Sequence, residues 1–216
     1  MLVAREYQDT HGRSPFAQWF NALNAQAAAK VTVAITRIGQ GHTANLKGVG
    51  GGVIEYKIDF GPGYRVYFGK DDERLVILLG GGTKKRQDRD IDAAQDHWQD
   101  HKRRTWEGIM ALTRDFKTTV KGRGQRDPKF RRAVLREAIE SAIAGDLDTG
   151  KAVLRDYINA TIGFPQLAAA VDIPPKSLMR MLAPAGNPIA SNFFEIVALL
   201  QRREGIHQPL FRNTTG

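Results

Sequence analysis

The hydrophobic period of this 216-residue chain changes about halfway along it. Nearly all strand-like runs lie before residue 80, and the clearest one alternates between apolar and polar residues, as does a strand that buries one face. The clearest run covers residues 53–60; a Gly-Pro-Gly turn at 61–63 follows it, and Tyr64–Phe68 and Arg74–Leu79 are the next two strands. After residue 110 the periodicity is helical. The sequence therefore predicts an α+β fold in which an all-α unit follows the sheet.

Helices and one more strand complete the first unit. Ser14-Pro15 begins a helix, because a serine side chain accepts from the free amides and proline suits the first helical position. A second helix is expected at Ala27–Ile38, a third at Arg89–Lys102, and a short strand at Val3–Tyr7. The order β-α-α-β-β-β-α predicts a small antiparallel sheet covered by helices.

The second unit contains helices that start at recognisable caps. Asp127-Pro128 begins the first long helix, and Asp148 is expected to cap the next one. The last helix covers Ser191–Glu204, with Phe194 and Val197 on its apolar side.

Composition limits the chemistry. The formal net charge is +9, with +4 in residues 1–104 and +5 in residues 105–216, so both units favour polyanionic partners. The absence of cysteine excludes disulfides, thiol nucleophiles and all-cysteine zinc sites. We find neither a secretory signal nor an apolar stretch long enough for a bilayer, and we expect a cytoplasmic protein without membrane contact.

His97 and His101 stand four residues apart on a predicted helix, which is metal-ligand spacing. Polar neighbours surround them, so we favour a solvated helix face over a zinc site. The stretch Gly80–Arg86 lacks the residue order of a phosphate-binding P-loop. We therefore expect neither a metal nor a cofactor.

Residues 164–182 have the spacing of a helix-turn-helix motif. Small Ala168 lies where the two helices cross, and Asp172 occupies the turn position that needs a left-handed backbone, which aspartate tolerates. Pro174-Pro175 begins the second helix. The outer face keeps polar side chains that suit base edges and phosphates: Gln166, Lys176, Ser177 and Arg180. The motif favours operator DNA as the partner and a homodimer, because one half-site binds weakly; a helix pair that packs against a protein is the alternative.

Basic residues in the first unit surround the predicted hairpin. They are Lys47, Lys57, Arg65, Lys84, Lys85 and Arg86. Aromatic residues interleave with them and are candidates for stacking on bases: Tyr56, Tyr64, Tyr67 and Phe68. A solvated sheet face with aromatics in the core is an equally good interpretation of the pattern.

Two family resemblances appear at these residues. Ile54–Phe68 together with Gly80–Ile91 resembles the RelE/HigB superfamily of toxins, in particular the addiction-module killer proteins. Leu154–Gly163, Ile173–Leu182 and Asn187-Pro188 in the second unit resemble the HigA-like antidotes of the same modules. The two are normally encoded side by side, so each resemblance supports the other.

The first resemblance implies a RelE-like fold and an endoribonuclease that cuts mRNA on the ribosome. It implies that Arg65 stabilises charge at the scissile phosphate and that Lys57 activates the 2′-hydroxyl or holds the backbone. Lys84 and Lys85 match a basic position after the last strand, and Lys47 is a looser candidate. The tyrosine that some relatives use near their C-terminus is absent from this half, so the general acid and base stay open.

The resemblances divide the chain into a toxin at residues 1–104, a linker at 105–109 and an antitoxin at 110–216. The codons for Trp106, Glu107 and Gly108 must contain a purine-rich stretch that resembles a ribosome-binding site just before Met110. We interpret the linker as a translated intercistronic segment, from a lost stop codon or a designed fusion. The antitoxin is expected to bind the toxin within or between chains, neutralise it and autorepress the operon.

Two questions stay open in the sequence. The competing function is a DNA-binding regulator without enzyme activity, in which an inactive toxin-like unit serves as an oligomerisation or corepressor surface. The basic segment Lys121–Arg136 fits a DNA arm, part of the contact with the toxin or, slightly better, a solvated helix face.

Overall fold

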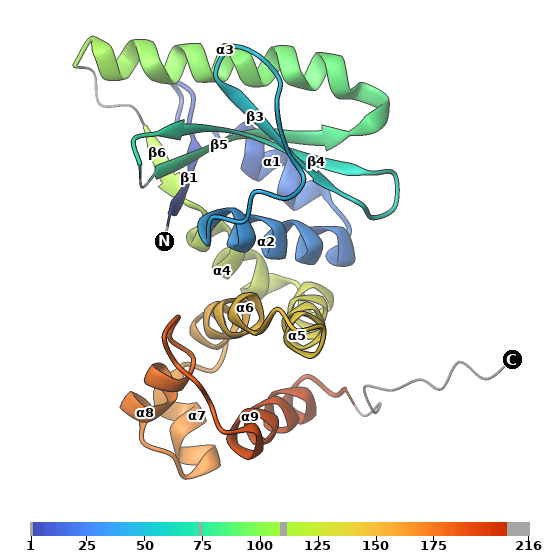
Figure 1. The fold of residues 1–216 in the computed structure, drawn as a ribbon, viewed down its shortest axis with the longest axis vertical. Coiled ribbons are helices and arrows are strands. Elements are labelled where there is room, and N and C mark those ends of the chain that lie inside the picture. Colours follow the sequence, from blue (N-terminus) through green and yellow to red (C-terminus); the bar gives the residue numbers. More distant parts are fainter. Residues whose placement is uncertain (1, 74, 109–111, 207–216) are drawn as a thin grey trace, which may run out of the picture.

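The computed structural model describes residues 2–73, 75–108 and 112–206 (Figure 1). It confirms the predicted fold class: a sheet with helices occupies about the first 115 residues, and a helical region follows. In the first part the elements are β1 (Val3–Tyr7), α1 (Pro15–Ala22), α2 (Ala25–Gly39), β2 (Leu46–Gly48), β3 (Val53–Ile58), β4 (Tyr64–Asp71), β5 (Leu75–Thr83), the 3₁₀ turn η1 (Lys84–Arg86), α3 (Gln87–Trp106) and β6 (Thr113–Asp115). In the second they are α4 (Phe116–Arg126), α5 (Pro128–Ile143), α6 (Leu147–Ala160), α7 (Phe164–Val171), α8 (Pro175–Met181) and α9 (Ala190–Arg203).

The sheet has the strand order β2-β3-β4-β5-β1-β6. Neighbouring strands are antiparallel except β1 and β5, which run parallel. Strands β2 and β6 were not predicted, because each has only three residues and shows no alternation. The parallel pair joins Val3–Glu6 to Leu75–Leu78, a long-range contact that local periodicity does not contain.

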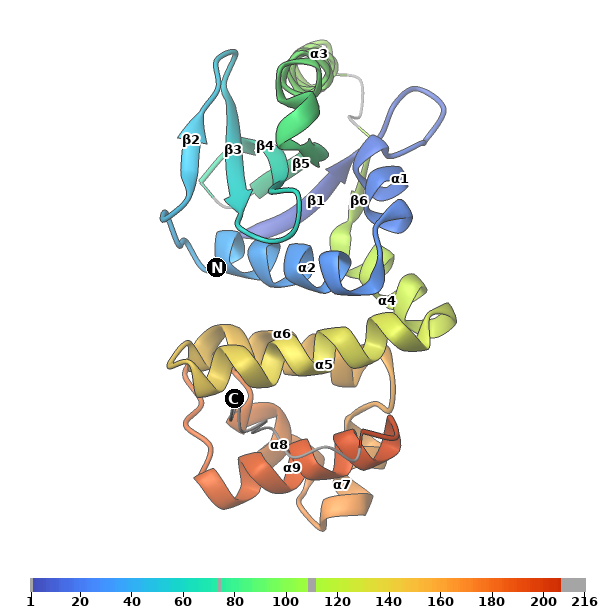
Figure 2. The ribbon, with the colours of Figure 1, turned by 90° about the vertical axis from the view of Figure 1, so that its right-hand side faces the viewer.

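Helices cover both faces of this sheet (Figure 2). Alternate residues of β4 and β5 explain why: Val66 and Val76 are buried in the core on the α1 and α2 side, whereas Tyr67 and Ile77 pack with Trp98 of α3 on the other. The first helix begins as predicted, since the Ser14 side chain accepts a hydrogen bond from the amide of Ala17 at 3.0 Å.

The helical region stacks beneath α2, with α5 and α6 next to it and α7 to α9 farther away (Figure 2). One continuous cluster of buried apolar side chains runs from the α2 face of the sheet into this region. Phe20 of α1 contributes directly: its ring centroid lies 5.5 Å from that of Phe116 and 5.8 Å from that of Phe130. The two halves of the chain therefore share a core.

Polar contacts also join the halves. Arg37 of α2 pairs with Asp146 at 2.9 Å, and Lys30 pairs with the buried Glu137 at 2.9 Å. On α4, the buried Arg123 donates to the carbonyl oxygens of Phe20 and Leu23 at the C-terminal end of α1, where the Phe20 carbonyl also accepts from the amide of Leu23. The guanidinium thus caps the negative end of a helix from the other half.

Strand β6, which comes after the predicted linker, pairs with β1 and forms an edge of the sheet. Arg114 donates to the fully buried carboxylate of Glu6, with 2.7 Å between Nη2 and Oε2. Helix α3 continues to Trp106 and so includes the start of the segment predicted as a linker. Met110 lies outside the described residues.

Two details of the helical half differ from the sequence prediction. The cap of α6 is Asp146, whose side chain accepts from the amide of Thr149, and not Asp148. On α9, Val197 is buried as predicted, but Phe193 is buried in place of Phe194, which is half exposed. Within the described residues, no helix is long and apolar enough to cross a membrane.

Candidate functional site

The basic residues of strands β2 to β4 lie on the face of the sheet that carries α3. Lys57 is directly opposite Arg65, and Lys47 is directly opposite Glu55. Residues opposite each other on paired strands point to the same face, and Glu55 is in turn opposite Tyr67, which packs on the α3 side. Lys47, Lys57 and Arg65 therefore share that face.

The turn η1 brings further cations to the tip of this hairpin. The amide of Lys84 donates to the carbonyl oxygen of Gly63 at 3.1 Å, which holds η1 against the turn between β3 and β4. Lys84, Lys85 and Arg86 are all exposed. The structure thus brings the predicted catalytic residues around one end of the sheet, with Lys47 at its β2 edge. We call Lys47, Lys57, Arg65, Lys84 and Lys85 the cationic cluster.

Arg65 differs from the others because it is buried, with 6% of its surface exposed. Its Nε lies 3.4 Å from Oε2 of Glu55, itself 4% exposed, and its Nη1 donates to the carbonyl oxygen of Gly63 at 2.8 Å. Gln87, the first residue of α3, donates to the same Glu55 oxygen at 2.8 Å. Arg65 is therefore a fixed guanidinium, whereas the lysines are exposed side chains.

Two more polar side chains complete this buried layer. Burial, with the negative charges of Glu55 and Asp90, raises the pKa of the Tyr67 hydroxyl. Burial likewise raises the pKa of the Asp90 carboxyl. A Cβ on Gly82 would lie only 1.8 Å from Oδ2 of Asp90, so this glycine leaves the space that the carboxyl occupies. Sequence reasoning missed Glu55, Gln87 and Asp90, because long-range packing places them here.

The proposed base-stacking aromatics are wrong, and the alternative, a core position, is correct. Tyr67 and Phe68 are fully buried, and Tyr56 and Tyr64 are nearly so. Each side chain fills the core on one side of the sheet, so none of these rings presents a face to a nucleotide.

The histidine pair on α3 also differs from its prediction as a solvated face. His101 is buried and its Nε2 lies 2.8 Å from Oδ2 of Asp71, while the partly buried His97 ring stacks on Tyr7. Among the described residues, no group of three or more histidine, aspartate or glutamate side chains has the arrangement of a metal site. Both histidines pack within the fold.

The second unit contains two short helices with the geometry expected for residues 164–182. Asp172 has φ = 51°, the left-handed conformation predicted for the turn between α7 and α8. Ala168 is buried between the helices, and a buried apolar set fixes their crossing: Leu167, Val171, Leu178 and Leu182. The local pattern thus predicted this part of the fold in detail.

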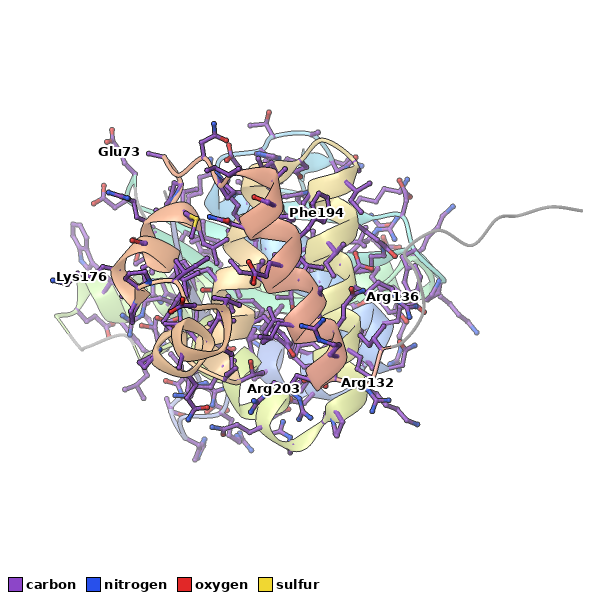
Figure 3. The ribbon with its side chains drawn as sticks, turned by 90° about the horizontal axis from the view of Figure 1, so that it is seen from below. Glu73, Arg132, Arg136, Lys176, Phe194 and Arg203 are labelled. Carbon is purple, nitrogen blue, oxygen red and sulfur yellow. The ribbon has the colours of Figure 1, made fainter. Side chains whose placement is uncertain are left out.

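The predicted DNA contacts lie on the outside of this helix pair. Gln166, Lys176 and Arg180 are exposed, and Ser177 is half-buried. Lys176 and Arg180 are four residues apart on α8 and so share a face. Viewed from below, Lys176 extends to one side of the molecule, and Arg132 and Arg136 lie on the other (Figure 3).

In the basic segment Lys121–Arg136, some residues belong to the contact between the halves and others to an exposed helix face. Arg123 is buried against α1, and Arg126 donates to Asn21 at 2.6 Å, so both belong to the contact between the halves. Arg132 and Arg136 are exposed on α5, as on a solvated helix face.

Comparisons with known proteins address the first half of the chain. Residues 18–99 match the family described as phage derived protein Gp49-like (DUF891). An uncharacterized protein of Haemophilus influenzae is 43% identical over 81 residues, which cover 37% of this chain and 82% of that protein. The family match contains β2 to β5 and most of α3, and thus the whole cationic cluster. No solved structure matches the chain.

Proposed function

Because the first half of this chain belongs to the Gp49-like family, which is part of the RelE/HigB-like toxins, we propose that the chain is a toxin and its antitoxin fused in one polypeptide. The observation that carries the proposal is the position of the cationic cluster inside the matched residues 18–99. Residues 1–104 are the proposed toxin and residues 110–216 the proposed antitoxin.

The proposed activity is ribosome-dependent cleavage of mRNA, as this broader family includes ribonucleases. In this mechanism Arg65 stabilises the negative charge that develops on the scissile phosphate, because its guanidinium is already fixed by Glu55 and Gly63. The exposed Lys57, Lys84 and Lys85 hold the RNA backbone. No step uses a metal or a cofactor.

The proposed role of the second half is to bind operator DNA through α8 as a homodimer and so repress its own operon. The left-handed turn at Asp172 and the exposed pair Lys176 and Arg180 support this role. The antitoxin function and the DNA binding are proposals from the motif and its geometry.

The shared core suggests how the fusion neutralises itself. The helical half packs on α2 and the β1 edge, on the opposite side of the sheet from the cationic cluster. It therefore leaves the lysines exposed, and we propose that it acts by keeping the toxin out of its binding site on the ribosome. Covalent linkage maintains a high effective concentration of the helical half at the toxin.

The experiment compares three proteins in a translating extract that contains one defined mRNA. Residues 1–115 retain β6 and the Arg114–Glu6 pair, and we expect this fragment to cut the mRNA only during translation. The full chain is expected to be much less active, and the fragment with Arg65→Ala inactive. Lys70→Ala, at an exposed cation on β4 outside the cluster, is the matched control and should cut normally. Equal cleavage by the full chain and the fragment would refute neutralisation.

One observation favours a second candidate function. Arg65 is buried in an ion pair with Glu55. A guanidinium that binds a phosphate must have N–H groups available to donate to it. A DNA-binding regulator with an inactive toxin-like unit accounts for that burial. The same extract distinguishes the two functions, since a regulator binds DNA but its 1–115 fragment leaves every mRNA intact.

A further inference from the structure

A cavity of about 600 Å³ lies between the two halves of the chain. Its walls come from the N-terminal residues of the chain, α2, α4, α6 and the loop that follows α8. This volume is in the range of small-molecule sites, which often occur where domains meet. None of the residues of the cationic cluster, and none of the proposed DNA contacts, lines this cavity.

Apolar side chains form much of the wall. They are contributed by both halves and include Leu2, Ile35, Phe116, Val120 and Leu182. These residues suit a hydrocarbon chain, because burying apolar surface contributes roughly 25 cal/mol for each Å² removed from water.

The charged residues at the cavity leave an excess of positive charge. Lys117 pairs with Asp156 at 2.7 Å, and Lys151 pairs with Asp148 at 2.9 Å. The remaining carboxylate, that of Asp115, accepts from the amide of Lys117 as the cap of α4.

Two other cations at the cavity differ from Lys117 and Lys151 because they are not paired with a carboxylate within the described residues. Lys121 and Arg155 are exposed and, within the described parts of the chain, make no ion pair and no side-chain hydrogen bond. They lie on α4 and α6, helices that pack against each other, and both line this one cavity.

From the apolar walls and these two cations we infer that the cavity binds a small amphiphile with a carboxylate head and a linear hydrocarbon tail. The head pairs with Lys121 and Arg155, and the tail lies among the apolar side chains between α2 and α4. Because both halves line the cavity, the ligand stabilises their contact and raises the melting temperature of the full chain.

Octanoate, below its micellar concentration, is the probe for the full chain. We expect saturable binding of one octanoate per chain by calorimetry, with a melting temperature that rises with its concentration. Two neutral or truncated probes separate the contributions: 1-octanol has the tail without the charge, and acetate has the charge without the tail. Both are expected to bind at least about tenfold more weakly than octanoate.

Paired variants test the position of the site. Lys121→Ala with Arg155→Ala should weaken octanoate binding by about tenfold or more. Lys129→Ala with Arg132→Ala removes the same charge from the exposed face of α5 and should leave the affinity unchanged. Ala152→Leu, which adds volume inside the cavity, should also lower the affinity.

Three results would overturn the inference. They are the absence of saturable octanoate binding, equal binding of 1-octanol or acetate, and equal effects of the two paired variants. Circular dichroism of each variant without ligand verifies folding, and octylammonium, with its charge reversed, should not bind. Since none of these measurements involves RNA or DNA, the outcome is independent of the proposed function.

Discussion

Glu55 and Arg65 lie on the neighbouring antiparallel strands β3 and β4, where Arg65 is two residues away from the position opposite Glu55. Both side chains are almost completely buried. The distance of 3.4 Å between Oε2 of Glu55 and Nε of Arg65 makes this a buried ion pair beneath the exposed lysines of the cationic cluster. Each residue compensates the charge of the other, so substitution of either one affects the fold as well as any chemistry.

Arg65→Ala should therefore lower the free energy of unfolding of the full chain by about 3 kcal/mol, because it leaves the carboxylate of Glu55 buried and unpaired. Urea unfolding followed by circular dichroism measures this loss. The double variant Glu55→Gln with Arg65→Met removes both charges and should recover much of it.

Arg65→Lys separates the ion pair from the shape of the guanidinium. Lysine keeps the positive charge but loses the planar set of donors that contacts both Glu55 and Gly63. We expect intermediate stability and loss of mRNA cleavage in the 1–115 fragment. Full cleavage by this variant would show that charge alone is sufficient at this position.

Arg123 is expected to be the most sensitive residue in the contact between the halves. Arg123→Ala removes its hydrogen bonds to the Phe20 and Leu23 carbonyls and its contact with the Phe130 ring, whose centroid lies 4.9 Å from Cζ. Hydrogen bonds from a charged donor contribute about 1.5–3 kcal/mol each, so the free energy of unfolding should fall by at least about 2 kcal/mol.

The control for this change is Arg132→Ala on the exposed side of α5, which should alter stability by less than about 0.5 kcal/mol. Urea unfolding of both variants gives the comparison. If Arg123→Ala is as stable as Arg132→Ala, the contacts of Arg123 with the end of α1 do not stabilise the fold, and the prediction is wrong.

Asp146 gives the contact between the halves a defined pH dependence. Burial disfavours its charged form, but hydrogen bonds from Thr149 and Arg37 outweigh burial and lower the pKa of its carboxyl below the ordinary 3.8. A carboxyl with a lowered pKa in the folded state stabilises the fold above its unfolded pKa and loses this contribution as the pH falls.

Asp146→Asn should therefore be less stable than the parent chain at pH 7, and the difference should shrink as the pH falls through 3.8 and below. Asparagine is also a good helix cap, so the exchange isolates the charge. Thermal melts across this pH range measure the difference. Asp115→Asn, at the cap of α4 and without an ion pair within the described residues, is the matched control; a difference that persists unchanged at low pH would contradict the prediction.

The order of the elements could be predicted from the sequence where the signals were local. Alternation identified β3, the turns and strand-like runs that follow it identified β4 and β5, and the turn residue Asp172 identified the helix pair α7–α8. These elements depend on residues that are close in sequence, so their patterns survive without knowledge of the rest of the chain.

The cationic cluster was predicted as a group, but its internal structure was not. The sequence placed Lys57 and Arg65 on adjacent strands on either side of the predicted turn, and the register pairs them directly. Periodicity does not show that Gln87 of α3 donates to Glu55 or that Asp90 lies near Tyr67, since helix and strand meet only in three dimensions.

The contact between the halves was the least predictable feature of the fold from the sequence. Strand β6 has three residues, and Arg123 and Arg126 resembled any other members of a basic helix face. Their roles depend on carbonyl and amide groups of α1 about a hundred residues away, as the separations of 100 and 105 residues show. Only the folded chain identifies such partners.

Arg180 is the residue of α8 that we expect to contribute most to DNA specificity. It is exposed one turn after Lys176, and arginine pairs with guanine through two hydrogen bonds. With a fragment of the DNA upstream of its own gene, Arg180→Ala should cost about 1–3 kcal/mol and reduce the discrimination against unrelated DNA. Fluorescence anisotropy at several salt concentrations measures both quantities.

Lys176→Ala should behave differently under our proposal that Lys176 contacts phosphate, since a lysine is a point charge without the paired donors of arginine. We expect binding to weaken by a similar factor on specific and unrelated DNA, with a salt dependence whose slope decreases by about 1. Arg136→Ala, on the side of the molecule away from Lys176 in Figure 3, is the control for net charge. If Arg136→Ala reproduces the effects of both variants, the chain binds DNA through general charge, and α8 is not its recognition helix.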